Sequence, residues 1–177
     1  MIVVTDTSVV LNLCWLRQES LLAAIYEDVF APGQVRLEFE QKAASDPRFT
    51  GLVFPAFITL AEPATIPPVL AANSDLDQGE IAALALTLER GIADVLIDEK
   101  AGRAAALALG LHVSGLLGVL IEGKHRKLVP ALRPMLDTLT VGARFWIDAR
   151  LRERGLLSII SKKMLQFHRC QPARVSG

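Results

Sequence analysis

Four acidic residues occupy positions in the sequence where a carboxylate is suited to chemistry. Asp6 and Asp98 each end a short apolar run that is typical of a buried parallel strand. Glu38 lies on a helical segment after a second such run, and Glu80 begins a segment made almost entirely of alanine, leucine and isoleucine. Because the carboxyl ends of strands open onto the ligand crevice in parallel α/β sheets, these acids are candidates for one shared site.

The chemistry of such a site follows from its charge. Carboxylates that gather in one place repel, raise one another's pKa and need a cation to stay ionised together. A ligand set of oxygens, without histidine or cysteine, favours Mg²⁺ or Mn²⁺ over zinc. Such a centre commonly activates a water molecule and neutralises a phosphodiester during its hydrolysis.

Each acid also has a purely structural interpretation. Asp6 and Asp98 could cap the helices that follow them, and Asp77-x-x-Glu80 fits a capping box. Glu38 could lie on a solvated helix face. Two observations favour function: two strands that both end in Asp bring the carboxylates together if the strands are neighbours, and an apolar helix has little use for an inward-facing Glu80.

The expected elements alternate along the chain, which predicts a parallel sheet with helices on both faces. Pro63, Pro67 and Pro68 predict a stiff loop between the third strand and the apolar helix. Strands are expected near residues 2–5, 29–31, 57–60, 93–98 and 111–113. Helices are expected near residues 9–16, 19–26, 35–43, 80–89, 101–109, 115–124 and 129–139, followed by a strand or turn at 143–147 and a helix at 148–154.

Composition limits the possible classes of protein. The 177 residues suit one domain, and lysine plus arginine balance aspartate plus glutamate at 19 each. A nucleic acid would therefore bind a local patch, for which the basic run with Lys124, Arg126 and Lys127 is the candidate, although a solvated helix end is an equal alternative. No signal peptide or membrane span is evident. Cys14 and Cys170 form no CxxC pair, which fits reduced thiols and a cytoplasmic protein.

The order and spacing of these motifs resemble the PIN domain superfamily, and more narrowly the stand-alone prokaryotic branch of VapC-type toxins. The resemblance covers about residues 1–155 as a PIN-like nuclease domain and leaves residues 156–177 as a basic, mobile tail. The motifs that carry it are Asp6-Thr7-Ser8, Pro32-x-x-Val35-x-x-Glu38, Leu76-Asp77-x-Gly79-Glu80 and Leu96-Ile97-Asp98-Glu99-x-x-x-Arg103.

The resemblance implies a three-layer α/β/α fold with a central parallel sheet of four or five strands. It implies a Mg²⁺- or Mn²⁺-dependent endoribonuclease, the toxin of a toxin–antitoxin pair, with RNA as substrate and with a small antitoxin and a second copy of the chain as partners. The catalytic residues and metal ligands carry over to Asp6, Glu38, Glu80 and Asp98, with Ser8 and Glu99 in support. The alternative is a PIN-fold binding or regulatory module with weak or no nuclease activity.

Overall fold

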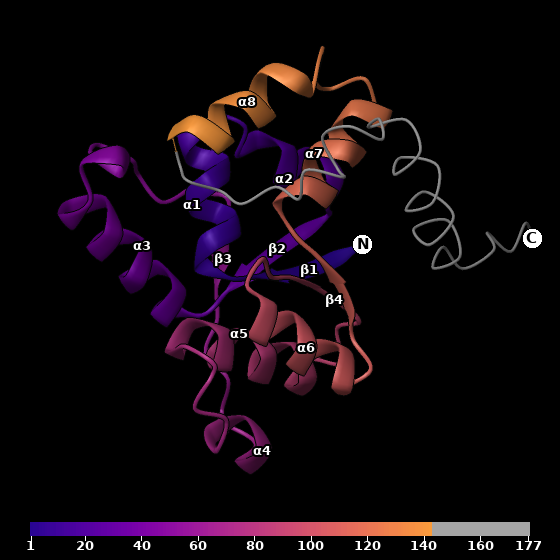
Figure 1. Ribbon diagram of the computed structural model, residues 1–177. Coiled ribbons are helices and arrows are strands. Elements are labelled where there is room, and N and C mark those ends of the chain that lie inside the picture. The colour runs from indigo at the N-terminus through magenta and orange to yellow at the C-terminus, as the bar shows by residue number, and fades with distance from the viewer. Residues whose placement is uncertain (143–177) are drawn as a thin grey trace, which may run out of the picture.

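The strands form one parallel sheet in the order β3-β2-β1-β4-β5 (Figure 1). This computed structural model describes residues 1–142 and the side chains of residues 1–139. The sequence predicted a parallel sheet of four or five strands, and a parallel sheet of five strands is confirmed. The strands are β1 (Ile2–Thr5), β2 (Asp28–Ala31), β3 (Thr59–Leu60), β4 (Asp94–Leu96) and β5 (His112–Ser114).

Strand β1 lies at the centre of the sheet because its residues are apolar on both faces. Val3 and Val4 are fully buried. Parallel pairing aligns Thr5 of β1 with Leu96 of β4, and the Asp6 amide donates to the Leu96 carbonyl over 3.0 Å. The two strands that end on aspartates are therefore neighbours, as the sequence analysis required.

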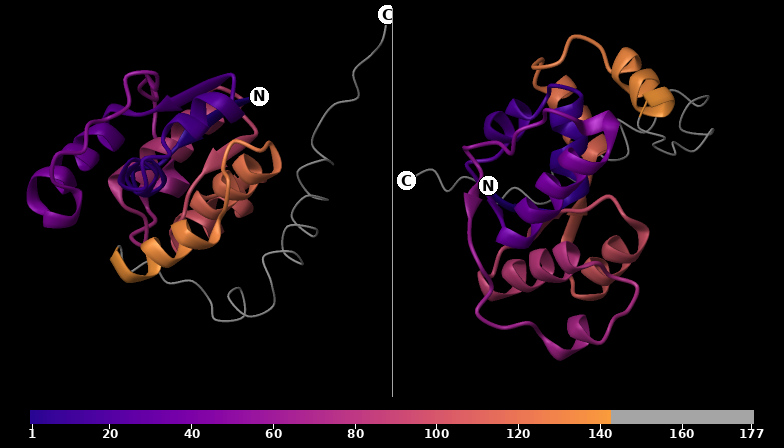
Figure 2. Two further views of the ribbon diagram at one scale, coloured as in Figure 1. Left: turned by 90° about the horizontal axis from the view of Figure 1, so that it is seen from above. Right: turned by 90° about the vertical axis from the view of Figure 1, so that its left-hand side faces the viewer.

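Helices cover both faces of the sheet and complete the three-layer fold (Figures 1 and 2). Helices α1, α2, α3, α7 and α8 share one apolar core with the sheet, while α4, α5 and α6 share the other. Helix α5 is buried almost throughout, as its composition predicted. The helices are α1 (Thr7–Trp15), α2 (Ser20–Ile25), α3 (Gly33–Ser45), α4 (Pro68–Ala71), α5 (Gln78–Glu89), α6 (Lys100–Ala108), α7 (Leu116–His125) and α8 (Arg133–Gly142), with a 3₁₀ turn η1 (Pro47–Phe49).

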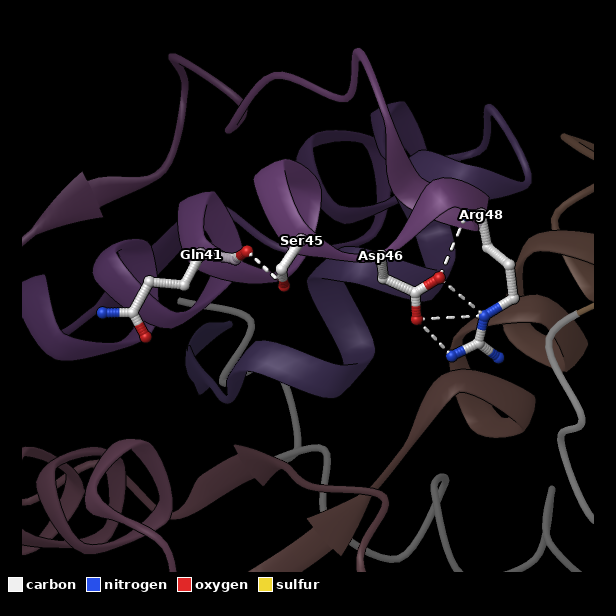
Figure 3. A network of polar contacts seen from close by, with 4 residues as sticks. All are labelled: Gln41, Ser45, Asp46 and Arg48. Atoms are coloured by element: carbon white, nitrogen blue, oxygen red, sulfur yellow. Dashed lines mark hydrogen bonds and ion pairs between the residues drawn. The ribbon is translucent and has the colours of Figure 1, made fainter.

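Helix α3 lies at the carboxyl end of the sheet and packs against both α1 and α5 (Figure 2). Its buried residues Val35 and Phe39 hold it to the core. The helix ends at the predicted break, where Asp46 accepts a hydrogen bond from the Arg48 amide at 3.0 Å and pairs with the guanidinium (Figure 3).

Three sequence expectations differ from the structure or lie outside it. The last described helix begins at Arg133 rather than Val129, because the chain after α7 folds back on the Gly123 carbonyl and Pro134 suits a first helical turn. The proline-rich loop carries the short helix α4. The expected elements at 143–154 and the tail at 156–177 lie outside the described residues.

Within residues 1–142, no helix is both long and apolar enough to cross a bilayer.

Candidate metal centre

Asp6 and Asp98 form a close pair at the carboxyl ends of β1 and β4. Asp6 is 2% exposed, and its Oδ1 accepts the Val9 amide at 2.9 Å, which makes it the N-cap of α1. Its Oδ2 accepts the Ser8 hydroxyl at 2.9 Å and the Asp98 amide at 3.4 Å. Burial, and next the charge of Asp98, raise the pKa of Asp6 to about 8. Asp6 therefore caps α1, as the structural interpretation predicted. Its raised pKa also means that a nearby positive charge would stabilise its ionised form.

Asp98 is positioned by helix α7 rather than by α6. Its Oδ1 accepts the amide of Leu116, the first residue of α7, at 3.0 Å. The expectation that Asp98 caps α6 is wrong, because Glu99 occupies that N-cap position and the Asp98 side chain turns toward the start of α7 instead. Gly115 lies so close that a Cβ there would overlap Asp98 Oδ1. The pair is therefore built by β1, β4 and the first turn of α7.

Glu38 links α1 to α5 across the carboxyl end of the sheet. Its Oε2 accepts the Thr7 hydroxyl at 2.6 Å. Its Oε1 accepts the Gly79 amide at 2.8 Å and the Gln34 side chain at 3.0 Å. The solvated-face interpretation of Glu38 is wrong, because α3 turns this side chain toward the first turns of two other helices.

Glu80 is buried at the start of α5 and is 3% exposed. It forms the predicted capping box: its amide donates to Asp77 Oδ1 at 2.7 Å, and its Oε2 accepts the Asp77 amide at 3.1 Å. Burial, and then the charges of Asp77 and Glu99, raise the pKa of Glu80 to about 7. Its Oε1 is buried and accepts no hydrogen bond from the described residues.

The acids at this edge fall into two adjacent groups. Within residues 1–142, the set of three whose ligand oxygens all lie within 4.8 Å of one another is Asp77, Glu80 and Glu99, here called the Asp77–Glu80–Glu99 cluster. The Asp6–Asp98 pair is the other group. Of the four acids named from the sequence, Asp6 and Asp98 form the pair and Glu80 belongs to the cluster, whereas Glu38 belongs to neither group. Asp77, interpreted only as a cap, belongs to the cluster.

Three glycines that the sequence analysis left without a role make room for the carboxylates. A Cβ on Gly79 would overlap Glu38 Oε2, and one on Gly102 would overlap Glu80 Oε1. Gly115 stands in the same relation to Asp98. The available signal was Gly102 within an alanine-rich helix, where glycine costs about 1 kcal/mol relative to alanine and so needs a packing reason.

The basic residues named from the sequence lie away from the acids. Lys124 donates to the Pro130 carbonyl at 2.6 Å, and Arg126 donates to carbonyls at the end of α2 and to an acid one turn earlier. Leu116 to Arg126 spans ten residues at 1.5 Å each, which puts Arg126 about 15 Å along α7 from the helix end that holds Asp98. These contacts agree with the helix-end alternative. An arginine closer to the acids is Arg103, which donates to the Ile97 carbonyl at 2.9 Å.

A parallel sheet with carboxylates collected at its carboxyl edge, between helical layers, defines a nuclease-type α/β/α fold of the PIN class. The chain belongs to the DUF3368 family of PIN domains, whose family model matches residues 2–160. No curated protein and no solved structure matches the chain.

PIN domains are generally metal-dependent nucleases, and the residues present here fit a divalent cation. The donors at this edge are carboxylate oxygens, which hard cations prefer. Asp6 is a buried acid beside a second acid, and Glu80 Oε1 is a buried oxygen that accepts no hydrogen bond from the described part of the chain. Each of these features is relieved by a positive charge.

Proposed function

We propose that this protein is a Mg²⁺- or Mn²⁺-dependent endoribonuclease that hydrolyses RNA phosphodiester bonds and serves as the toxin of a toxin–antitoxin pair. Membership of a PIN family supports the nuclease class. The observation that carries the proposal is the Asp6–Asp98 pair, in which two carboxylates from adjacent strand ends meet and the pKa of the buried one is raised to about 8. Such perturbed acids in a shared site mark candidate catalytic groups.

Each residue of the centre has a distinct role in this proposal. Asp6 and Asp98 would hold the cation, whose chemistry when bound is to polarise the phosphate and to increase the acidity of water. The Ser8 hydroxyl and the Val9 amide fix the orientation of Asp6, so that this carboxylate is positioned before substrate arrives. Glu38 and Glu80 would orient the attacking water, and Thr7 fixes Glu38 through its hydroxyl.

Partner proteins belong to this proposal as well. The expected partners are a small antitoxin and a second copy of the chain, and the expected location is the cytoplasm. Support comes from a stretch with several exposed apolar side chains, which a protein surface would cover. They are Val53, Phe57, Leu60, Ile66 and Val69. The same stretch favours the second candidate function, a PIN-fold regulatory module that acts through protein contacts without cutting RNA.

RNA cleavage by the purified full chain separates the two candidates. The assay compares Mg²⁺ and Mn²⁺ with EDTA, and the wild type with Asp6→Asn. The nuclease proposal expects cleavage that needs the cation and falls sharply in the variant. Cleavage that is unchanged by Asp6→Asn would come from a contaminant or from another site, and would refute the centre as drawn. Absence of cleavage under every condition favours the regulatory module.

A further inference from the structure

The hydrogen-bond ladder between β4 and β5 is interrupted at its carboxyl end, next to the Asp6–Asp98 pair. The Ile97 amide donates to the Ser114 carbonyl at 2.9 Å, in keeping with the parallel pairing. In a regular parallel ladder, the Leu116 amide would next donate to the Ile97 carbonyl. Leu116 instead donates to Asp98 Oδ1 at 3.0 Å, which leaves the Ile97 carbonyl to another donor.

Arg103 of α6 takes the interrupted position in this ladder. Its Nη1 donates to the Ile97 carbonyl at 2.9 Å, and its side chain is partly buried. Because helical side chains point toward the N-terminus of their helix, this guanidinium reaches back to the end of β4. A Cβ on Gly115 would lie 3.1 Å from the Ile97 carbonyl oxygen and would overlap Asp98 Oδ1. The carbonyl that holds Arg103 and the carboxylate of Asp98 therefore border the same glycine.

The Arg103 guanidinium has more donors than this contact uses. Arginine presents five N–H groups in a rigid fork that matches the oxygens of a phosphate. Within residues 1–139, the Ile97 carbonyl is its acceptor, and neither Nε nor Nη2 donates to a protein atom. The backbone contact thus fixes one nitrogen of the guanidinium and leaves the others for a ligand.

The charge of the carboxyl edge gives such a group a purpose. The Asp6–Asp98 pair, Glu38 and the Asp77–Glu80–Glu99 cluster collect carboxylates there, and the backbone of RNA is itself an anion. Arg103 brings a permanent positive charge to this edge, because a guanidinium stays protonated in proteins. Arg126 does not serve this purpose, because it lies about 15 Å along α7 from the helix end that holds Asp98.

We propose that Arg103 binds a backbone phosphate of RNA beside the Asp6–Asp98 pair, and that the Ile97 carbonyl holds its guanidinium in place for this contact. The identity of the ligand as RNA rests on the proposed function, whereas the position of the guanidinium rests on the hydrogen bond to Ile97. A phosphate contact carries no sequence information, so Arg103 should contribute equally to the binding of RNAs that differ in sequence.

Three variants separate a phosphate contact from a structural role. Arg103→Gln removes the charge and keeps an amide that can donate to the Ile97 carbonyl. Arg103→Lys keeps the charge and loses the fork of donors. The matched control is Lys100→Gln, which removes the same charge from an exposed residue one turn earlier on α6. Circular dichroism checks folding, and deuterium exchange at the Leu116 amide checks that Asp98 keeps its position.

The measurement is fluorescence anisotropy of a short labelled single-stranded RNA with the full-length chain, in EDTA to prevent metal-dependent cleavage and at several salt concentrations. We expect Arg103→Gln to raise the Kd at least about 10-fold and to reduce the slope of log Kd against log salt by about 0.7, the value for one phosphate of a single strand. Arg103→Lys should keep the slope and raise the Kd less. Lys100→Gln should bind within about threefold of the wild type, as expected for an exposed charge.

Several results would overturn the contact. A folded Arg103→Gln protein that binds RNA with the Kd and the slope of the wild type is one, and a wild type that binds no RNA is another. Equal weakening in Lys100→Gln would show an effect of overall charge. Weaker binding with an unchanged slope and faster exchange at Leu116 would show a displaced Asp98 instead of a lost phosphate contact.

Failure of the proposed function gives a different result. RNA binding that depends on Arg103, without metal-dependent cleavage, would refute the nuclease while supporting the phosphate contact. Metal-dependent cleavage by a wild type whose RNA binding does not depend on Arg103 would refute the contact and leave the nuclease in place.

Discussion

The two ends of the sheet treat their acidic residues differently. At the amino end, acids face basic groups: Glu27 pairs with the N-terminal ammonium at 3.3 Å, and Asp94 Oδ1 lies 3.5 Å from His112 Nδ1. At the carboxyl end, backbone amides and hydroxyls hold Asp6 and Glu38. Amides and hydroxyls orient a carboxylate but bring no full positive charge. A carboxylate held in this way has no positive partner among the contacts named here, whereas Glu27 already has one in the N-terminal ammonium.

The largest test of this contrast is to remove one acid from each end. We expect Asp6→Asn to lower the rate of RNA cleavage by about a thousandfold, which is about 4 kcal/mol of transition-state stabilisation. Asp94→Asn, which alters an acid at the amino end of the sheet, should keep cleavage within about twofold of the wild type. Initial rates of RNA cleavage are compared between the two variants. Equal losses of activity in both would contradict the proposed difference between the two ends of the sheet.

The stability of the ion-free protein should depend on pH in the direction set by the raised pKa values. The folded pKa is about 8 for Asp6 and about 7 for Glu80, above their ordinary values of 3.8 and 4.5. These acids therefore contribute stability that is complete below their unfolded pKa and is lost as the pH rises through 7 and 8. In EDTA, the free energy of unfolding should fall from pH 5.5 to pH 8.5.

Denaturant unfolding with and without Mn²⁺ measures this effect. Mn²⁺ at pH 8.5 should restore stability, because it replaces the protons as the positive partner. Asp6→Asn should be more stable than the wild type at pH 8.5 without metal, by about 1–3 kcal/mol. An equal pH dependence in the variant and the wild type would show that Asp6 is ionised without cost in the folded state.

A smaller loss is expected when a glycine at the carboxyl end acquires a Cβ. Gly115→Ala should displace Asp98 and lower the cleavage rate about 10- to 100-fold, while the melting temperature changes little. The matched control is Gly123→Ala at the far end of α7, where the atoms nearest to the new Cβ belong to the side chains of Leu21 and Val129. Equal cleavage rates in the two variants would argue that the position of Asp98 is not critical.

The smallest effect is expected at the basic end of α7. Arg126→Gln should change the KM for RNA by less than about twofold, because this guanidinium already donates to carbonyls at the end of α2 and lies about 15 Å along α7 from the acids. The melting temperature of the Arg126→Gln variant should fall slightly. A large rise in the KM for RNA, reproduced in Lys127→Gln, would support the RNA contact predicted from the sequence.

Much of the fold was readable from the sequence because local patterns determine it. The apolar runs before Asp6 and Asp98 fixed two strands, and the breaks at Asp46-Pro47 and Gly91 ended the helices before them. The beginning of α8 was not readable, because a local backbone turn after α7 holds the preceding residues out of a helix. In this turn Lys127 has a positive φ of 61°, and the amides of Leu128 and Val129 donate to the Gly123 carbonyl.

The site was readable to the level of which acids approach the sheet edge, but not how they divide. Adjacent strands predict that Asp6 and Asp98 lie close together, and they do: the Asp98 amide donates to Asp6 Oδ2 at 3.4 Å, and the charge of Asp98 raises the pKa of Asp6. Glu80 could lie beside the Asp6–Asp98 pair or beside Asp77. The choice depends on side-chain rotamers at the start of α5, which the spacing of residues in the sequence does not determine. The side chain of Asp98 also had two helix N-termini within reach, those of α6 and α7. The sequence suggested only α6, which follows Asp98 directly along the chain, whereas the structure places the side chain at α7.

Helix capping at this edge has a practical consequence for studying the protein. The amides of Val9, Gly79 and Leu116 each donate to a carboxylate of the centre, so their exchange with deuterium reports on those acids directly. An ion that binds one of these carboxylates and makes it less mobile should slow hydrogen exchange at the amide that donates to it. The exchange rates of these three amides therefore indicate which of Asp6, Glu38 and Asp98 an ion contacts, without any label on the protein.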